Sequence, residues 1–147
     1  MQLNRNSMVL IVCAGNSARS QMAEGLLQQL ARGRFIVRSA GAHPKDAVHP
    51  LAVEVMAEIG IDIHHAYPKP VHIFLRDPVR VAICVCDEAS RACAIFPQDI
   101  EQVQWTIPDP AAIPGTDEAC RAAFRQARDL IAQHLDAWIT TQVICDN

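Results

Sequence analysis

The sequence of 147 residues lacks an apolar run long enough to cross a bilayer, which takes about 20 residues. It also lacks the apolar stretch and small-residue cleavage site of a secretory signal. A large charge excess is missing too, since the formal net charge is −3, and this gives no reason to expect a nucleic acid or a membrane surface as partner. We therefore expect one monomeric domain in the cytoplasm.

Cysteine, in contrast, is plentiful. A chain of this size, half of it hydrophobic, does not need a disulfide scaffold, and nothing in the sequence points to secretion. In a reducing compartment, so many thiols indicate catalysis, redox cycling or metal binding. We expect Cys120 and Cys145, in the last helix and the tail, to be structural or bystanders. The six are Cys13, Cys84, Cys86, Cys93, Cys120 and Cys145.

Apolar runs alternate with helical patterns along the chain. This alternation predicts an α/β fold, a single domain with an open parallel sheet. We expect residues 1–7 to be a flexible N-terminal tail, 8–140 the domain and 141–147 a C-terminal tail. The predicted strands are 8–13, 35–41, 80–86 and 103–107; the predicted helices run from Ser20 to near Gly33, from Pro50 to Gly60 and from an N-cap at Thr116.

Cys13 ends the first predicted strand, and Arg19 stands where the first helix begins. The backbone N–H groups of such a loop, with the helix N-terminus, form a cradle for a tetrahedral anion. The same donors and the Arg19 charge favour the thiolate form of Cys13. The alternative is a buried structural cysteine before an ordinary turn. The predicted oxyanion-binding residues are Ala14, Gly15, Asn16, Ser17, Ala18, Arg19 and Ser20.

Ligands of parallel sheets bind at the carboxyl ends of the strands. Cys13, Cys86 and Asp109 each lie at or just beyond such an end, so they meet at one edge if their strands are neighbours. Asp109 stands between two prolines that stiffen its loop, and we predict it to be the general acid. Its alternative role is that of a solvent-facing turn residue.

The pair Cys86 and Cys93 separates two chemistries. A phosphatase needs only Cys13, an arginine and an acid, whereas a reductase needs electrons that further thiols can supply. Cys86 is predicted to attack Cys13, and Cys93 then to attack Cys86, which requires the segment between them to refold. Cys84 competes for the resolving role, but we expect burial to keep it protonated and inert. A zinc site of Cys84, Cys86 and Cys93 is the other alternative, and it lacks a clear fourth ligand.

The stretch Val9-Leu-Ile-Val-Cys-Ala-Gly-Asn-Ser-Ala-Arg-Ser-Gln-Met-Ala-Glu24 closely resembles the anion loop of arsenate reductases built on the low-molecular-weight tyrosine phosphatase fold. The resemblance continues through residues 39–41, 50–63, 86–93 and 105–111. It implies four parallel strands in the order 2-1-3-4 and reduction of arsenate to arsenite. It also implies thioredoxin as reductant, without a metal or an organic cofactor.

The resemblance also implies the roles of the site residues. Cys13 forms a thiol–arsenate adduct, Arg19 and the loop amides bind the oxyanion, and Asp109 protonates the departing oxygen. Ser20 helps to keep Cys13 ionised. Cys86 releases arsenite by attacking Cys13, and Cys93 completes an exposed disulfide.

The redox segment departs from the family pattern at one position, and a second cysteine pair leaves the electron donor open. Ala94 stands where the family often has proline after the last cysteine. Some relatives use glutathione and glutaredoxin, and their Cys-x-Cys pair resembles Cys84 and Cys86.

Some family members hold a potassium ion beside the anion loop. Asn16, Glu24 and Ser39 match that site, but Lys69 aligns where an acidic ligand would be. We predict that the Lys69 ammonium takes the place of the ion. The pair His64 and His65 is expected to be a solvated turn.

Two other functions remain as alternatives, a phosphatase and a redox or anion-sensing module without turnover. A phosphotyrosine pocket usually has aromatic walls, whereas aromatic residues make up 5% of this chain. Tyr67 is the single tyrosine, and Ala111 stands where phosphatase relatives tend to carry another. Weak phosphatase activity is expected even of a reductase.

Overall fold

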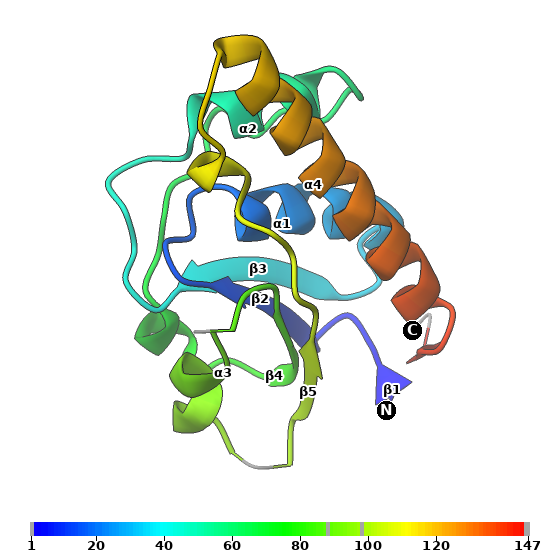
Figure 1. The fold of residues 1–147 in the computed structure, drawn as a ribbon. Helices are drawn as coiled ribbons and strands as arrows, with labels where there is room; N and C mark the ends of the chain where they lie inside the picture. Colours follow the sequence, from blue (N-terminus) through cyan, green and yellow to red (C-terminus); the bar gives the residue numbers. More distant parts are fainter. Residues whose placement is uncertain (1, 88, 98, 146–147) are drawn as a thin grey trace.

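The computed structural model describes residues 2–87, 89–97 and 99–145, with backbone only for Ser90. Four strands form a parallel sheet in the order β3-β2-β4-β5 (Figure 1). Counted along the chain among themselves, they have the order 2-1-3-4, which confirms the topology that the resemblance implied. Their bounds are Met8–Cys13 for β2, Ile36–Gly41 for β3, Val79–Cys84 for β4 and Glu101–Gln104 for β5.

The two central strands owe their place to their apolar runs. Every residue of β2 is buried, as is all of β4 except Arg80. The edge strand β5 alternates between half-buried and exposed residues. The predicted edge strand, 103–107, is therefore placed too late, because the first half of β5 is polar and gives no apolar signal. The chain also leaves β4 at Cys84, two residues earlier than predicted.

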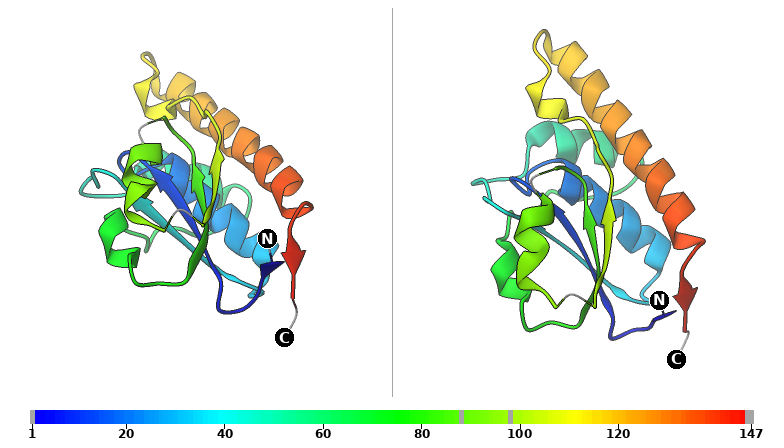
Figure 2. Two further views of the ribbon diagram at one scale, coloured as in Figure 1. Left: turned by 90° about the horizontal axis from the view of Figure 1, so that it is seen from below. Right: turned by 60° about the horizontal axis from the view of Figure 1, so that its bottom comes forward.

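Helices cover both faces of this sheet. The helices α1 (Arg19–Ala31), α2 (Pro50–Ala57) and α4 (Asp117–Ile139) lie on one side of it (Figures 1 and 2). The shorter turns α3 (Ala89–Ala92), η1 (Val71–Phe74) and η2 (Cys93–Ile95) lie on the other side. The crossover after β5 carries η3 (Pro110–Ala112), which brings the chain back above the sheet edge.

The helix starts follow the predicted signals. The Thr116 hydroxyl accepts a hydrogen bond of 3.1 Å from the Ala119 N–H, which confirms the N-cap of α4. Pro50 is the first residue of α2, as predicted. Ion pairs join α4 to the end of α2, where hydrogen bonds from Arg125 and the nearby Arg128 lower the pKa of Glu58 to about 2.

The two predicted tails pair with each other. The strands β1 (Gln2–Leu3) and β6 (Val143–Ile144) form a small parallel sheet, and the Cys145 N–H donates to the Leu3 carbonyl at 2.7 Å. The Leu3 side chain is fully buried. The expectation of flexible tails is therefore wrong for residues 2–7 and 141–145, because apolar stretches as short as those around Leu3 and Val143 make no pattern. Residues 1 and 146–147 lie outside the described part.

Within the described residues, no helix is both long and apolar enough to cross a membrane.

The buried Leu3 gives a test of this terminal sheet. We expect Leu3→Ala to lower the free energy of unfolding by about 2–4 kcal/mol, because it removes buried methyl groups and leaves a cavity. Its matched control is Val143→Ala in the partner strand, which is 55% exposed and should cost less than about 0.5 kcal/mol. Urea denaturation measures both, and equal losses would contradict the packing of Leu3.

Candidate functional site

Cys13 ends β2 with its sulfur buried beneath the loop that follows. The Asn16 N–H donates to the Cys13 Sγ at 3.2 Å, and the Ser20 Oγ lies 2.8 Å from the same sulfur. Asn16 has a φ of 50°, a left-handed conformation that asparagine tolerates better than most residues. This turn directs the backbone N–H at the sulfur, where it stabilises negative charge.

The loop is held in shape by buried polar contacts and by one close approach. The Asn16 Nδ2 donates to the Ser20 Oγ at 2.7 Å and to the Ser39 Oγ at 3.0 Å. The Gln21 Nε2 donates to the Asn16 carbonyl at 3.1 Å. A Cβ at Gly41 would lie 2.9 Å from both the Ala14 carbonyl oxygen and the Asn16 nitrogen. Glycine is therefore required at position 41 for β3 to carry the loop.

A cavity of about 70 Å³ opens above Cys13, and we name it the Cys13 cavity. It brings together three residues that the sequence analysis predicted, Cys13, Arg19 and Asp109. Ala18 precedes α1, and its methyl group cannot accept a hydrogen bond as a capping side chain would. The first N–H groups of the helix are therefore left for a ligand. The lining residues are Cys13, Ala14, Gly15, Ser17, Ala18, Arg19, Lys45, His49, Asp109 and Ala111.

Two hydrogen bonds position the acid and the guanidinium. The Asp109 carboxylate accepts from the Ala111 N–H at 3.0 Å and so caps η3. The Arg19 Nη1 donates to the Ile107 carbonyl at 2.9 Å, two residues before Asp109. The arginine that begins α1 therefore ties the aspartate loop to the mouth of the cavity.

Lys45 and His49 line the Cys13 cavity, and the sequence analysis missed both. The loop that carries them runs along the anion loop, with the Lys45 N–H donating to the Gly15 carbonyl and the His49 N–H to the Ser17 carbonyl. His49 also caps α2, since its Nδ1 accepts from the Leu51 N–H at 3.1 Å. Burial and Lys45 lower the pKa of His49. The one available signal was Pro50, which marks His49 as the cap position.

The other two cysteines of the predicted relay, Cys86 and Cys93, are not among the residues that line this cavity. Cys86 is in the bend after β4, where the Gln104 side chain donates to its carbonyl at 3.0 Å. Cys93 begins η2, and its sulfur lies 3.6 Å from the sulfur of Cys84. Cys84 was expected to be inert, but it is a direct neighbour of Cys93. The predicted meeting at one sheet edge thus holds for Cys13 and Asp109 within the cavity.

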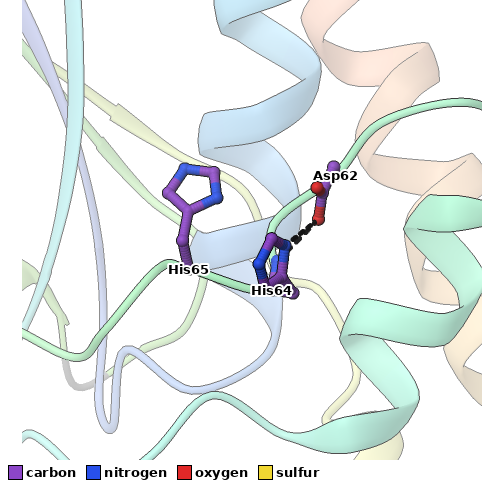
Figure 3. A group of neighbouring side chains, drawn as sticks. All are labelled: Asp62, His64 and His65. Carbon is purple, nitrogen blue, oxygen red and sulfur yellow. Dashed lines mark hydrogen bonds and ion pairs between the residues drawn. The ribbon is translucent and has the colours of Figure 1, made fainter.

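Among the described residues, one group of side chains has the spacing of metal ligands: Asp62, His64 and His65. Their ligand atoms lie within 4.8 Å of one another on an exposed loop (Figure 3). The Asp62 carboxylate lies 2.6 Å from the His64 Nδ1, and hydrogen bonds from His64 lower the pKa of Asp62. The loop is a solvated turn, as predicted, whose three groups could also hold a divalent cation. The alternative zinc site of three cysteines is not among such groups.

Lys69 lies beside the predicted cation pocket, with its ammonium 4.0 Å from the Glu24 Oε1. Both side chains are largely buried, and that Glu24 oxygen has no hydrogen-bond partner among the described residues. Burial lowers the pKa of Lys69, whereas Glu24 raises it. The Asn16 Oδ1 faces the Lys69 backbone, from whose N–H it accepts at 2.9 Å. The ammonium therefore supplies a positive charge to Glu24, while Asn16 and Ser39 are joined to each other.

This geometry can be compared with known proteins. The family model of the low-molecular-weight phosphotyrosine protein phosphatases matches residues 8–145, which include the whole Cys13 cavity. The chain belongs to this family. Family membership makes it an enzyme of phosphatase-like fold.

Two relatives of this chain are named arsenate reductases. The chain is 36% identical over 133 residues to an arsenate reductase of Halalkalibacterium halodurans, covering 90% of this chain and 95% of the relative. It is 32% identical over 136 residues to an arsenate reductase of Bacillus subtilis, covering 92% and 97%.

Solved structures agree with these relatives. An arsenate reductase in its oxidised state has a TM-score of 0.77 at 29% identity, covering 90% of this chain and 96% of the other. An arsenate reductase in a phosphate-binding state has a TM-score of 0.73 at 31% identity, covering 91% and 97%.

Lys45 gives a test of the Cys13 cavity. Replacing Lys45 with alanine removes a cation from the cavity wall, and we expect the dissociation constant for phosphate to rise about tenfold. Calorimetric titration with phosphate measures it. Arg76→Ala is the control, because Arg76 is exposed and does not line the cavity. Equal losses in both variants would show an effect of net charge alone.

The Lys69 ammonium gives a second test. We expect potassium chloride to raise the melting temperature of the wild type no more than choline chloride at equal ionic strength. Lys69→Met leaves the buried Glu24 carboxylate without its counter-charge, so we expect a lower melting temperature that potassium partly restores. Strong stabilisation of the wild type by potassium would contradict the substitution of the ion by Lys69.

Proposed function

We propose that this chain reduces arsenate to arsenite with Cys13 as the nucleophile. The observation that carries the proposal is the Cys13 cavity, where a thiol, a guanidinium and a carboxylate surround a space of oxyanion size. Its support from relatives is the arsenate reductase name, which proteins at 32–36% identity share over more than nine tenths of their length.

In the first step, the Cys13 thiolate attacks the arsenic of arsenate, and an oxygen leaves as water. The Asn16 N–H and the Ser20 hydroxyl hold charge on the sulfur before the attack. Arg19 and the free N–H groups at the start of α1 bind the remaining oxygens. Asp109 donates the proton to the departing oxygen.

In the second step, Cys86 attacks the Cys13 sulfur. A Cys13–Cys86 disulfide forms, the electron pair of the sulfur–arsenic bond stays on arsenic, and arsenite is released. Cys93 then attacks Cys86 and frees Cys13. The short helix α3 stands between Cys86 and Cys93 along the chain, and Cys93 begins η2. The segment from Cys86 to Cys93 must therefore rearrange between the reduced and oxidised states.

We further propose thioredoxin as the reductant of the resulting disulfide. The alternative donor is glutathione with glutaredoxin, which suits a pair formed by Cys84 and Cys86. The two paths differ in the disulfide that the donor attacks, which is Cys86–Cys93 for thioredoxin and Cys84–Cys86 for glutaredoxin. Variants of Cys93 discriminate them, because only the thioredoxin path as drawn here requires Cys93.

A phosphatase is the second candidate, and the family description favours it. Phosphate and arsenate have the same shape and charge, so the Cys13 cavity accepts both. The cavity wall carries Ala111 and no phenylalanine, tyrosine or tryptophan among its described residues. Tyr67 is 66% exposed and belongs to a different pocket. These walls suit a small oxyanion better than a phosphotyrosine side chain.

The deciding experiment is arsenate reduction coupled to thioredoxin, thioredoxin reductase and NADPH. We expect steady turnover by the wild type, and loss to the assay background in Cys86→Ser and Cys93→Ser because each breaks the relay. We expect Asp109→Asn to lower the rate by about 10²–10⁴-fold. Cys145→Ser, which changes a thiol outside the relay, is the control.

Two outcomes would contradict the proposal in different ways. Turnover at the wild-type rate by both relay variants would refute the disulfide relay. Hydrolysis of phenyl phosphate without any arsenate reduction would make the chain a phosphatase.

A further inference from the structure

Cys84 and Cys93 form a pair of thiols on the face of the sheet opposite α1. Cys84 is the last residue of β4, and Cys93 is the first residue of η2. Their sulfur atoms are 3.6 Å apart, and their side chains are 1% and 0% exposed. Closing a disulfide shortens a sulfur–sulfur distance to about 2.05 Å, so these two sulfurs need to approach by only about 1.5 Å.

The pKa values of the two thiols are shifted in opposite directions, which suits a thiol exchange. The hydrogen bond to Cys93 and burial raise the pKa of Cys84. The same hydrogen bond lowers the pKa of Cys93. Cys93 is therefore the better nucleophile of the two, and Cys84 keeps its proton until a partner disulfide reaches Cys93.

We propose that Cys84 and Cys93 form a second redox disulfide, so that one chain reduces two arsenate ions before it needs an external reductant. This inference rests on the proposed function. It gives a role to Cys84, whose position beside Cys93 the relay of Cys13, Cys86 and Cys93 does not use.

The electrons balance as follows. The first arsenate takes two electrons and leaves the Cys13–Cys86 disulfide. Cys93 attacks the Cys86 sulfur, which forms Cys86–Cys93 and releases the Cys13 thiolate. Cys84 then attacks the Cys93 sulfur, gives its proton to the departing Cys86 thiolate, and forms Cys84–Cys93. Cys13 and Cys86 are now both reduced.

A second arsenate then meets the same pair of thiols and again leaves Cys13–Cys86. In total, four thiols become two disulfides, four electrons are transferred, and two arsenate ions become two arsenite ions. An external donor first reduces Cys13–Cys86, which frees the Cys86 thiol. Cys86 then attacks the buried Cys93 sulfur, which forms Cys86–Cys93 and releases the Cys84 thiol, and the donor reduces this second disulfide.

The test counts arsenite in the absence of any reductant. Reduced protein is freed of small thiols without oxygen and mixed with excess arsenate. The background is the full chain with Cys120→Ser and Cys145→Ser, so that only four thiols remain. We expect two arsenite per chain in this background, and one in the same background with Cys84→Ser. Cys84→Ala should also give one, which separates loss of the thiol from an effect of the buried hydroxyl.

Mass spectrometry locates the disulfides in the same samples. Cys84 and Cys86 share the tryptic peptide of residues 81–91, so fragment ions broken at Val85 are needed to tell them apart. We expect Cys84 linked to Cys93, and Cys13 linked to Cys86, after two turnovers.

The outcomes separate this inference from the proposed function. One arsenite per chain in the four-thiol background, with Cys84 still open to alkylation, would overturn the second disulfide and leave arsenate reduction intact. No arsenite from any variant would overturn the proposed function and the storage of electrons with it. Two arsenite per chain with Cys84→Ser would also overturn the second disulfide. Three thiols form only one disulfide, whose two electrons reduce one arsenate, so the second arsenite would have another source.

Discussion

The Asn16 side chain holds the catalytic end of this molecule together. Its amide nitrogen donates to Ser20 at the start of α1 and to Ser39 in β3, and its oxygen accepts from the Lys69 backbone. Its own N–H points at the Cys13 sulfur. A single buried asparagine thus connects Cys13 to three separate segments of the chain. All of these groups are polar and withdrawn from water, so each depends on the others for its hydrogen bonds.

The register of the sheet divides the chemistry between two places. Val12 in β2 lies beside Cys84 in β4, so the strand that delivers Cys13 to the anion loop also runs alongside the cysteine at the end of β4. The Cys13 cavity, where we propose that the oxyanion binds, is preorganised and has few ways to change. Cys86 lies in the bend after β4 and Cys93 in the short turn η2, where a few residues can rearrange without disturbing the sheet. Under the proposed mechanism, rigid binding and mobile electron transfer therefore belong to different elements.

The part of this arrangement that is local in sequence was predictable. Cys13 and Arg19 are joined by one loop, and their relation follows from a strand, a turn and a helix start. Lys45 and His49 enter the same cavity through contacts between two loops, which no periodicity records. Cys84 was correctly predicted to be buried, and its inertness stays a prediction; the sequence does not tell which element covers that face of the sheet. That element carries Cys93.

The burial of Cys84 has a chemical consequence under the scheme of two disulfides. A donor protein needs a sulfur that it can reach, and Cys84 and Cys93 are 1% and 0% exposed, whereas Cys86 is 7% exposed. Cys86 is then the residue through which all electrons pass, inward from the donor and outward to Cys13. Its place in the bend between the strand end and α3 suits this role, because it adjoins the sheet edge that holds Cys13 and the turns that hold Cys93. Under this scheme, Cys86 exchanges with both disulfides. The buried Cys84–Cys93 pair holds electrons that reach the oxyanion only through Cys86.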